Sequence, residues 1–554
     1  MKKFYILVIT LLMCNFSFAQ LSIEGTPKSF LYKDLAVLLT ASIEVEQPDL
    51  DTVIKQDNSD ESMNKIRRFG VIIPVKVDFF EKADMAEVED GRLWILKLSS
   101  SRAQALSLYS SNFYLPKGGE LYIYNPDHSQ VIGAFTSINN IELKTFATEL
   151  IYGDEMIIEY FQPNSITEQA SIEITELGYA YRDCQSKIND IKFGEYGSSG
   201  SCNVNANCSE GNNYRQAQRG VARIQIRMNE TSTGWCTGSL VNNTNRDLLP
   251  YLLSAHHCVE NVQSAVYYSQ FIFYFNYQTS GCTNVSEPGY RTLTGTIVKA
   301  KGTKSDFVLF QLNNAIPSYF NAYWNGWTRT LSASTSGVGI HHPQGDVKKI
   351  STYNSTLTTA SYPGYTANVH WKVQWVKTTN GFGITEGGSS GSPLFNSSSK
   401  IVGTLTGGSS SCFAPVASKL DYYGKFSYAW NQNGTTANTQ LKPWLDPRNT
   451  GVMELNGDDN ITVSLEDVLK EEETLSMIFP NPANNIINIT LSAQKTETKV
   501  TIYDHLGKII LSEIIPANKT NHSISSQNLS SGHYIIRYNS GEKTWINKLV
   551  INND

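Results

Sequence analysis

The sequence predicts an all-β chain of several domains, and three observations support that prediction. Its 554 residues are too many for one hydrophobic core. Its apolar runs are short and are separated by glycine and asparagine turns, which is typical of β-barrels and β-sandwiches. Six of its eight cysteines fall in one stretch, between positions 202 and 412. We therefore expect one disulfide-bonded domain flanked by regions of different composition.

The N-terminus predicts export. Lys2 and Lys3 precede an apolar run over residues 4–13, and a small-x-small cleavage site ends at Ala19. The run is too short to span a bilayer. We therefore expect residues 1–19 to be a signal peptide, and export makes disulfide bonds possible.

Residues 20–192 are expected to form a β-rich propeptide. They contain strand-like runs such as 71–77 and 121–124 and one cysteine, Cys184. They hold no cluster of residues with catalytic character, so a binding module is the alternative interpretation.

Cys14 lies in the expected signal peptide, and residues 193–450 hold the remaining six cysteines, which allow 15 pairings that spacing alone does not resolve. An acidic linker is expected over 451–474, as a solvated spacer. Residues 475–554 repeat a β pattern without cysteine and predict a small β-sandwich. The net charge of −6, without any basic block, argues against a nucleic-acid partner.

Two short strings in the central stretch indicate chemistry. The first, Leu253–Cys258, places His257 beside a cysteine, and His256 is the competing candidate. The second, Gly387–Pro393, places Ser390 in a glycine-rich turn. A histidine base and a serine nucleophile are the core of serine-protease chemistry.

The remaining parts of such a site can be assigned. The backbone N–H groups of Gly388 and Ser390 would form an oxyanion hole, where losing one donor typically costs about 2.7–4 kcal/mol. Asp306 begins an apolar strand between the two strings and is the candidate for the carboxylate that orients the histidine. The order His257, Asp306, Ser390 is the chymotrypsin-like order.

These stretches resemble the bacterial lysyl endopeptidases of the chymotrypsin-like superfamily. The strings that carry the resemblance are spread over about 197–450: Cys236–Asn243, Ala255–Cys258, Ser305–Phe307, Ile340–Pro343, Gly388–Pro393, Ser410–Cys412 and Trp444–Pro447. The resemblance implies two six-stranded β-barrels with the catalytic triad between them. It also implies three disulfides, which are Cys202–Cys412, Cys208–Cys282 and Cys236–Cys258.

The resemblance also implies a substrate preference. Asp421 matches the aspartate at the base of the family's primary specificity pocket, and Thr406 and Gly407 are expected to line that pocket. A buried carboxylate requires a cationic partner, so cleavage after lysine is expected. Thr406 stands where the family has a histidine, and the tryptophan that stacks on that histidine falls near Tyr362. A broader preference that includes arginine is therefore the alternative.

No metal or cofactor is expected. His341 and His342 form a second His-His pair, but no HExxH motif or cysteine ligand spacing accompanies them. We expect structural roles for both. Glu386, beside the serine turn, is expected to be solvated.

The last domain resembles the C-terminal sorting domain of the type IX secretion system. The strings are Phe479–Pro482, Ile502–Lys508 and Lys548–Ile551. The resemblance implies the type IX machinery as a partner and transport across both membranes, followed by release or surface attachment.

Together these features predict a monomeric, secreted serine endopeptidase that acts on peptides with lysine before the scissile bond. A non-catalytic surface adhesin on a protease scaffold is the alternative from another class. Cleavage after lysine would make Lys192 or Lys187 a self-processing site, which would leave Cys184 outside the mature six-cysteine set.

Overall fold

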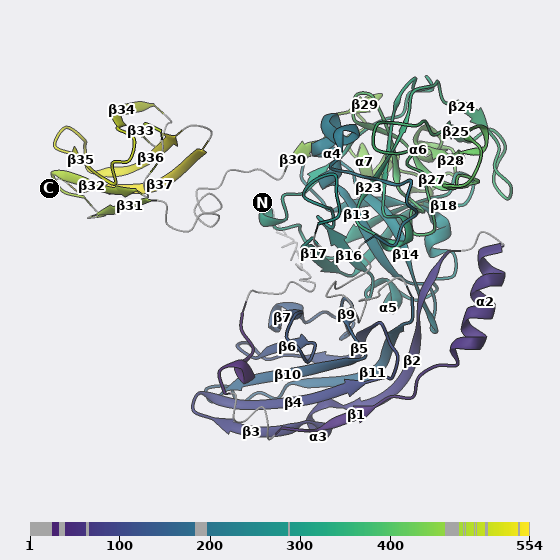
Figure 1. The fold of residues 1–554 in the computed structure, drawn as a ribbon, viewed down its shortest axis with the longest axis horizontal. Helices are drawn as coiled ribbons and strands as arrows, with labels where there is room; N and C mark the ends of the chain where they lie inside the picture. The colour runs from purple at the N-terminus through teal and green to yellow at the C-terminus, as the bar shows by residue number, and fades with distance from the viewer. Residues whose placement is uncertain are drawn as a thin grey trace, which may run out of the picture. The chain divides into compact units, whose positions relative to one another are not determined.

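The fold was analysed in a computed structural model (Figure 1). The described residues are 25–32, 39–62, 66–182, 197–285, 288–459, 476–479, 481, 483–491, 494, 496–504, 508–540 and 543–552. The chain forms two compact units, residues 1–460 and 461–554. The expected signal peptide, Cys184, Lys187 and Lys192 lie outside the described residues. Among those residues no helix is both long and apolar enough to cross a membrane.

The N-terminal region, residues 25–182, is a two-layer β-structure. One layer has the strand order β1-β4-β10-β6-β7, with β3 paired to β4. Its strands are β1 (Ser42–Glu44), β3 (Asp84–Val88), β4 (Gly91–Ser99), β6 (Glu120–Tyr124), β7 (Val131–Phe135) and β10 (Glu155–Pro163). Buried and less buried residues alternate along much of β4, which is typical of a sheet with one face on the core.

The second layer continues into the next part of the chain. Its strands are β2 (Arg68–Asp78), β5 (Ala105–Tyr114), β8 (Phe146–Ala147), β9 (Ile151–Tyr152) and β11 (Ser171–Ala180). Leu96 and Ile158 of the first layer share one core with Leu106 and Leu177 of the second. Two helices accompany the layers, α2 (Leu50–Ser62) and α3 (Phe79–Lys82).

The central region, residues 197–459, begins with a barrel-like sheet of order β17-β16-β13-β14-β15-β19-β18. Its strands are β13 (Val221–Arg227), β14 (Ser232–Leu240), β15 (Tyr251–Ser254), β16 (Ile272–Phe275), β17 (Arg291–Thr294), β18 (Thr296–Gly302) and β19 (Phe307–Leu312). The end strands β17 and β18 are joined by Gly295 alone, so the sheet curls back on itself. Ile224, Phe273 and Phe310 fill its interior.

A second sheet of the central region has the order β12-β23-β22-β26-β27-β28-β25-β24, and β21 joins it beside β27. Its strands are β12 (Val204–Asn205), β21 (Gly326–Thr328), β22 (Gly337–His341), β23 (Lys349–Tyr353), β24 (Thr358–Ala360), β25 (His370–Gln374), β26 (Pro393–Asn396), β27 (Lys400–Gly408) and β28 (Leu420–Lys425). Leu253 and Leu309 of the first sheet share a core with Ile340 and Ile401 of the second. The short helices are α4 (Arg215–Arg219), α5 (Ala265–Tyr268), α6 (Phe426–Asn431) and α7 (Lys442–Leu445).

The two regions are joined by one continuous sheet. Strand β2 pairs antiparallel with β14, and Figure 1 shows these strands side by side. Phe69 and Ile72 of β2 share a buried cluster with Trp235 and Tyr274 of the barrel-like sheet. The N-terminal region is therefore packed as part of the same unit.

The central region extends beyond the predicted boundary at residue 450. Strand β29 (Glu454–Leu455) pairs with β21, and β30 (Asp458–Asp459) pairs with β20 (Tyr323–Trp324). Arg219 forms an ion pair with Asp459. These acidic residues are held by strand pairing and a cation, so the first part of the expected solvated linker belongs to the central region.

The second unit is a small β-sandwich. One sheet contains β31 (Ser476–Phe479), β32 (Ile486–Leu491) and β35 (Asn521–Ser525). The other contains β33 (Thr498–Tyr503), β34 (Ile509–Ile515), β36 (Gly532–Ser540) and β37 (Lys543–Ile551). Ile489 and Ile524 pack with Ile502 and Ile536 from the opposite sheet. The predicted all-β architecture with a C-terminal sandwich is confirmed.

Candidate active site

His257 and Asp306 are joined through two hydrogen bonds. Asp306 Oδ2 lies 2.8 Å from His257 Nδ1, and Asp306 Oδ1 accepts the backbone N–H of His257 at 2.9 Å. Asp306 is fully buried, whereas His257 keeps 15% of its side-chain surface exposed. Asp306 also has a positive φ of 55°, a left-handed conformation that aspartate tolerates better than most residues. The structure therefore selects His257 over His256 as the partner of this carboxylate.

The carboxylate controls the charge of the His257 ring. Burial lowers the pKa of His257, but the charge of Asp306 and its hydrogen bond more than offset that effect. The net pKa is raised above the ordinary 6.5. The pKa of His256 is lowered, chiefly by burial, although Asp306 acts in the opposite direction. The pKa values of the two adjacent histidines are therefore shifted in opposite directions.

The turn that carries Ser390 is fixed by main-chain bonds. Thr237 of β14 donates its N–H to Ser390 O at 2.8 Å, and Gly391 donates to Leu405 O at 2.9 Å. Gly388 has φ +91°, and a Cβ there would lie 2.8 Å from His342 O. Only glycine fits that position without strain.

The N–H groups expected to form the oxyanion hole lie in this turn. The N–H of Ser389 is bonded to Glu386 O, and that of Gly391 to Leu405 O. Among the described residues, no backbone acceptor is bonded to the N–H of Gly388 or of Ser390. An oxyanion hole requires donors of this kind.

One cavity of about 280 Å³ brings together His257, Ser390, Thr406, Gly407 and Asp421, whereas Asp306 and Gly388 do not line it. It is lined by Arg67, His257, Gln344, Tyr362, Thr385, Glu386, Gly387, Ser390, Leu405, Thr406, Gly407, Gly408, Ser410 and Asp421. Within the described chain, no hydrogen bond joins Ser390 Oγ to the His257 ring. Such bonds commonly tighten only when substrate binds.

Asp421 is a buried carboxylate in that cavity. Its Oδ2 accepts hydrogen bonds from Trp375 Nε1 at 2.5 Å, Thr385 Oγ1 at 2.8 Å and Ser410 Oγ at 2.7 Å. Burial raises the pKa of Asp421, and these hydrogen bonds oppose the shift without cancelling it. All three donors are neutral, so they fix the carboxylate without balancing its charge.

Thr406 has a partner that the sequence did not indicate. Its Oγ1 lies 3.1 Å from Nε2 of His370, which is fully buried on β25. Burial lowers the pKa of His370 to about 4, with the charge of Asp306 acting against that shift. The ring of Tyr362 lies 5.9 Å from the His370 ring. A histidine therefore does stand beside residue 406, but it comes from a different strand.

Tyr365 is a second residue that the sequence did not indicate. Burial raises its pKa most, and the nearby charge of Asp306 raises it further. Neither Tyr365 nor His370 lies in a recognisable motif, and both are far from Asp306 in the sequence.

His341 and His342 are held by local hydrogen bonds. Nδ1 and Nε2 of His341 lie 2.8 Å and 2.9 Å from the hydroxyls of Ser389 and Ser351. His342 Nδ1 lies 2.9 Å from Asp346 O. Burial lowers the pKa of His341 to about 3. No group of three or more potential ligands is placed to hold a metal ion in the described part of the chain.

Glu386 is bonded to protein rather than solvated as expected. It accepts the backbone N–H of Gly200 at 3.0 Å and Nδ2 of Asn203 at 2.8 Å. Burial raises its pKa, against the effect of these hydrogen bonds. The start of the central region is thereby anchored next to the serine turn.

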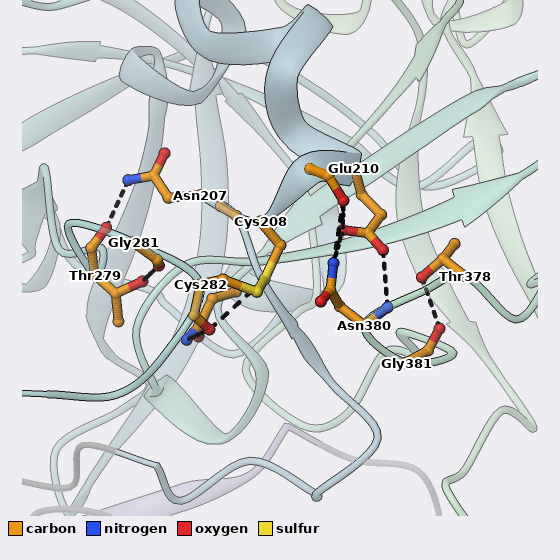
Figure 2. The surroundings of a disulfide bond; sticks show 12 residues. Asn207, Cys208, Glu210, Thr279, Gly281, Cys282, Thr378, Asn380 and Gly381 are labelled. Carbon is orange, nitrogen blue, oxygen red and sulfur yellow. Dashed lines mark hydrogen bonds between the residues drawn. A yellow bond between two sulfur atoms is a disulfide. The ribbon is translucent and has the colours of Figure 1, made fainter.

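Three disulfides have the pairing that the resemblance implied: Cys202–Cys412, Cys208–Cys282 and Cys236–Cys258. The last of these connects β14 to the residue after His257. Figure 2 shows the surroundings of Cys208–Cys282, where Glu210 accepts Nδ2 of Asn380 at 2.8 Å. Burial raises the pKa of Glu210, but hydrogen bonds from Thr378 and Asn380 lower it to about 2.

The fold and the site therefore define an all-β protein that carries the side-chain set of a serine protease. Residues 196–424 match the family described as lysyl endopeptidase, C-terminal domain, and residues 477–552 match the secretion system C-terminal sorting domain. Both predicted resemblances are confirmed. The sorting-domain match also supports the predicted export to the exterior or the outer cell surface.

A curated relative, lysyl endopeptidase of Pseudomonas aeruginosa, is 30% identical over 300 residues. The match covers 52% of this chain and 62% of that relative's own length. Two solved structures are more distant. An HtrA-type protease with a decapeptide has a TM-score of 0.29 and 8% identity, covering 62% of this chain and 96% of its own. A Glu endopeptidase has a TM-score of 0.25 and 17% identity, covering 42% and 92%.

Proposed function

We propose that this protein is a secreted serine endopeptidase that hydrolyses peptide bonds after lysine, with cleavage after arginine as the broader alternative. The observation that carries the proposal is the contact between His257 and the buried Asp306 in a cavity also lined by Ser390 and Asp421. The lysyl endopeptidase match supports the same reading.

The reaction begins at Ser390. Its Oγ attacks the scissile carbonyl carbon while His257 Nε2 takes the hydroxyl proton. Asp306 accepts Nδ1–H, which holds the required tautomer and stabilises the imidazolium. The N–H groups of Gly388 and Ser390 stabilise the oxyanion.

The intermediate then collapses and the C–N bond breaks. His257 gives its proton to the leaving amine, and an acyl-enzyme remains on Ser390. Water attacks that ester with the same base, which releases the acid product and restores the serine.

Asp421 selects the substrate residue before the scissile bond. A buried charge without an opposite partner is costly, so a cationic side chain that enters the cavity is favoured over a neutral one. Thr406 and Gly407 line the same cavity and limit its shape.

The test is a digest of one defined peptide that contains Lys-X, Arg-X and Leu-X bonds, followed by mass spectrometry. Cleavage at Lys-X alone supports the lysyl preference, and cleavage at Lys-X and Arg-X supports the broader one. Ser390→Ala is the control and should cleave none of them.

The adhesin alternative predicts no reaction at Ser390. Correctly processed protein should label with a fluorophosphonate if the proposed chemistry is right. Absence of labelling, together with no cleavage of any bond, would favour the adhesin.

We also propose that residues 20–192 are a propeptide removed after Lys192 or Lys187, and that the type IX machinery exports a monomeric protein. Self-processing predicts that Ser390→Ala accumulates as an intact precursor. Normal processing of that variant would contradict self-cleavage.

A further inference from the structure

A segment of the N-terminal region lies in the candidate active site. Strand β2 begins at Arg68, which pairs with Gly234 of β14. Two and three residues beyond Gly234, β14 continues to Cys236 and to Thr237, whose N–H bonds to Ser390 O. The start of β2 is therefore attached to the strand that also holds the proposed nucleophile.

Arg67 reaches the cavity itself. It lines the cavity together with Ser390 and Asp421. A Cβ built on Gly387 would lie 2.8 Å from Cβ and 3.0 Å from Cδ of Arg67. The aliphatic part of the arginine therefore lies directly against the serine turn, where only a glycine leaves room for it.

The residues that flank Arg67 in the sequence lie at different parts of the cleft. Ile66 lines a neighbouring cavity that includes His257 and Tyr362. Phe69 stacks on Trp235 with ring centroids 4.1 Å apart and an interplanar angle of 16°. Both of these aromatic side chains are buried. The chain thus passes from the histidine, through the cavity, to the edge of β14.

This path is the one a substrate needs. A substrate must place one side chain in the specificity pocket and lay its extended main chain beside Ser390. Addition of a strand to a sheet edge supplies main-chain hydrogen bonds, and pockets for side chains supply specificity. Arg67 and Asp421 line the same cavity, and the charge of an arginine is opposite to that of a carboxylate.

The segment is held in place from both regions. Arg227 of β13 forms an ion pair with Glu176 of β11, with Nη2 and Oε1 2.6 Å apart. Arg68 pairs with Asp57, with Nη2 and Oδ1 2.7 Å apart. The first contact ties the N-terminal region to the barrel-like sheet. The second fixes Arg68, the neighbour of Arg67, within the N-terminal region.

We propose that residues 66–69 are a built-in inhibitor that occupies the cleft as a substrate would, with Arg67 in the basic specificity pocket. Phe69 on Trp235 then marks a further substrate subsite, which favours an aromatic residue two positions after the scissile bond. This inference rests on the proposed function.

The test measures fluorophosphonate labelling of Ser390 in the full chain, with intact and processed bands separated on a gel. We expect intact wild-type protein to label at least tenfold more slowly than the processed band. Arg67→Glu should raise labelling of the intact band about tenfold. Lys117→Glu makes the same charge change at an exposed site of the N-terminal region and should leave labelling slow.

Equal labelling rates for intact Arg67→Glu and wild type would overturn the inhibitor. Absence of labelling even in the processed band would instead reject the proposed function, so the two failures are distinguishable.

A second measurement does not depend on folding of the variant. An acetylated peptide with the sequence of residues 66–72 is added to the processed enzyme with a chromogenic lysyl substrate. It should compete, and peptides with Arg67→Glu or Phe69→Ala should each compete at least tenfold more weakly. Equal competition by all three peptides would remove both the pocket assignment and the aromatic subsite.

Discussion

Asp306 holds His257 by its main chain and by its ring at once, at 2.9 Å and 2.8 Å. Few side chains could do both, because the carboxylate needs two acceptor oxygens and a left-handed backbone at the start of β19. The orientation of the His257 ring is therefore set by one buried residue. Removing the charge while keeping the shape is the most direct way to test it.

We expect Asp306→Asn to lower kcat about 10⁴-fold with little change in KM, because the amide favours the wrong histidine tautomer. Steady-state kinetics on a lysyl substrate measure this effect. Circular dichroism of the same sample checks the fold. A loss below about tenfold would show that Asp306 does not orient the base.

The pH dependence follows from the raised pKa of His257. A general base must be neutral, so kcat/KM should fall as pH decreases through a value above 6.5. Asp306→Ala removes the charge and the hydrogen bond that raise the pKa, so its residual activity should persist to lower pH. Profiles between about pH 5 and 9 measure both inflections. An acid limb that Asp306→Ala does not shift would contradict this assignment.

Asp421→Ala should change selectivity more than chemistry. Loss of a buried charge partner costs on the order of 2–5 kcal/mol, so kcat/KM at Lys-X should fall at least tenfold. Cleavage at Leu-X in the same peptide is the internal control and should change little. A proportional loss at both bonds would assign Asp421 to general stability.

The disulfide beside His257 should matter for both stability and rate. Cys236 and Cys258 are 22 residues apart, and closing a loop of that size contributes about 3 kcal/mol. Replacing both with serine should lower Tm and kcat. Cys208 and Cys282 neither adjoin His257 in the sequence nor line its cavity, so replacing them should lower Tm with little effect on kcat.

Both double variants are compared by calorimetry in a Ser390→Ala background, which prevents self-digestion, and by kinetics without it. Equal kcat values for the two pairs would show that the Cys236–Cys258 bond does not position His257.

Because Glu149 is buried, we expect the folded protein to be more stable in acid than at higher pH. Burial raises the pKa of Glu149 to about 7, although Thr292 and the charge of Arg223 oppose the shift. Between the ordinary 4.5 and about 7, the folded state binds more protons than the unfolded state, so stability falls as pH rises. Glu149→Gln should flatten this dependence.

Denaturant unfolding of Ser390→Ala protein at about pH 5 and pH 8, with and without Glu149→Gln, measures that difference. A slope that the substitution leaves unchanged would place its origin elsewhere.

Much of the candidate site was predictable because its parts lie in short local strings. The turn around Ser390 needs glycine at Gly388, where φ is positive, and His257 lies next to Cys258. Such constraints act over a few residues and are visible in the sequence. The β-sandwich of the second unit was predictable for a similar reason, since apolar and polar residues alternate along its strands and turns separate the strands.

Other features arise from contacts between distant strands. His370 reaches Thr406 because β25 and β27 both pair with β28. Arg67 reaches the cavity because β2 joins the edge of β14 across more than 150 residues. Nothing in either local sequence specifies such a partner. The boundary at residue 450 was misplaced because acidic residues usually indicate solvent, whereas Arg219 and β20 retain Asp459 here.

The pairing of β29 and β30 limits how much of the C-terminal side can be removed by proteolysis. A peptidase that detached the sorting domain before Asp459 would strip an edge strand from Tyr323–Trp324 and expose unpaired main chain. The released enzyme should therefore end after Asp459. The mass of the C-terminal peptide of the secreted form would show where the sorting domain was removed.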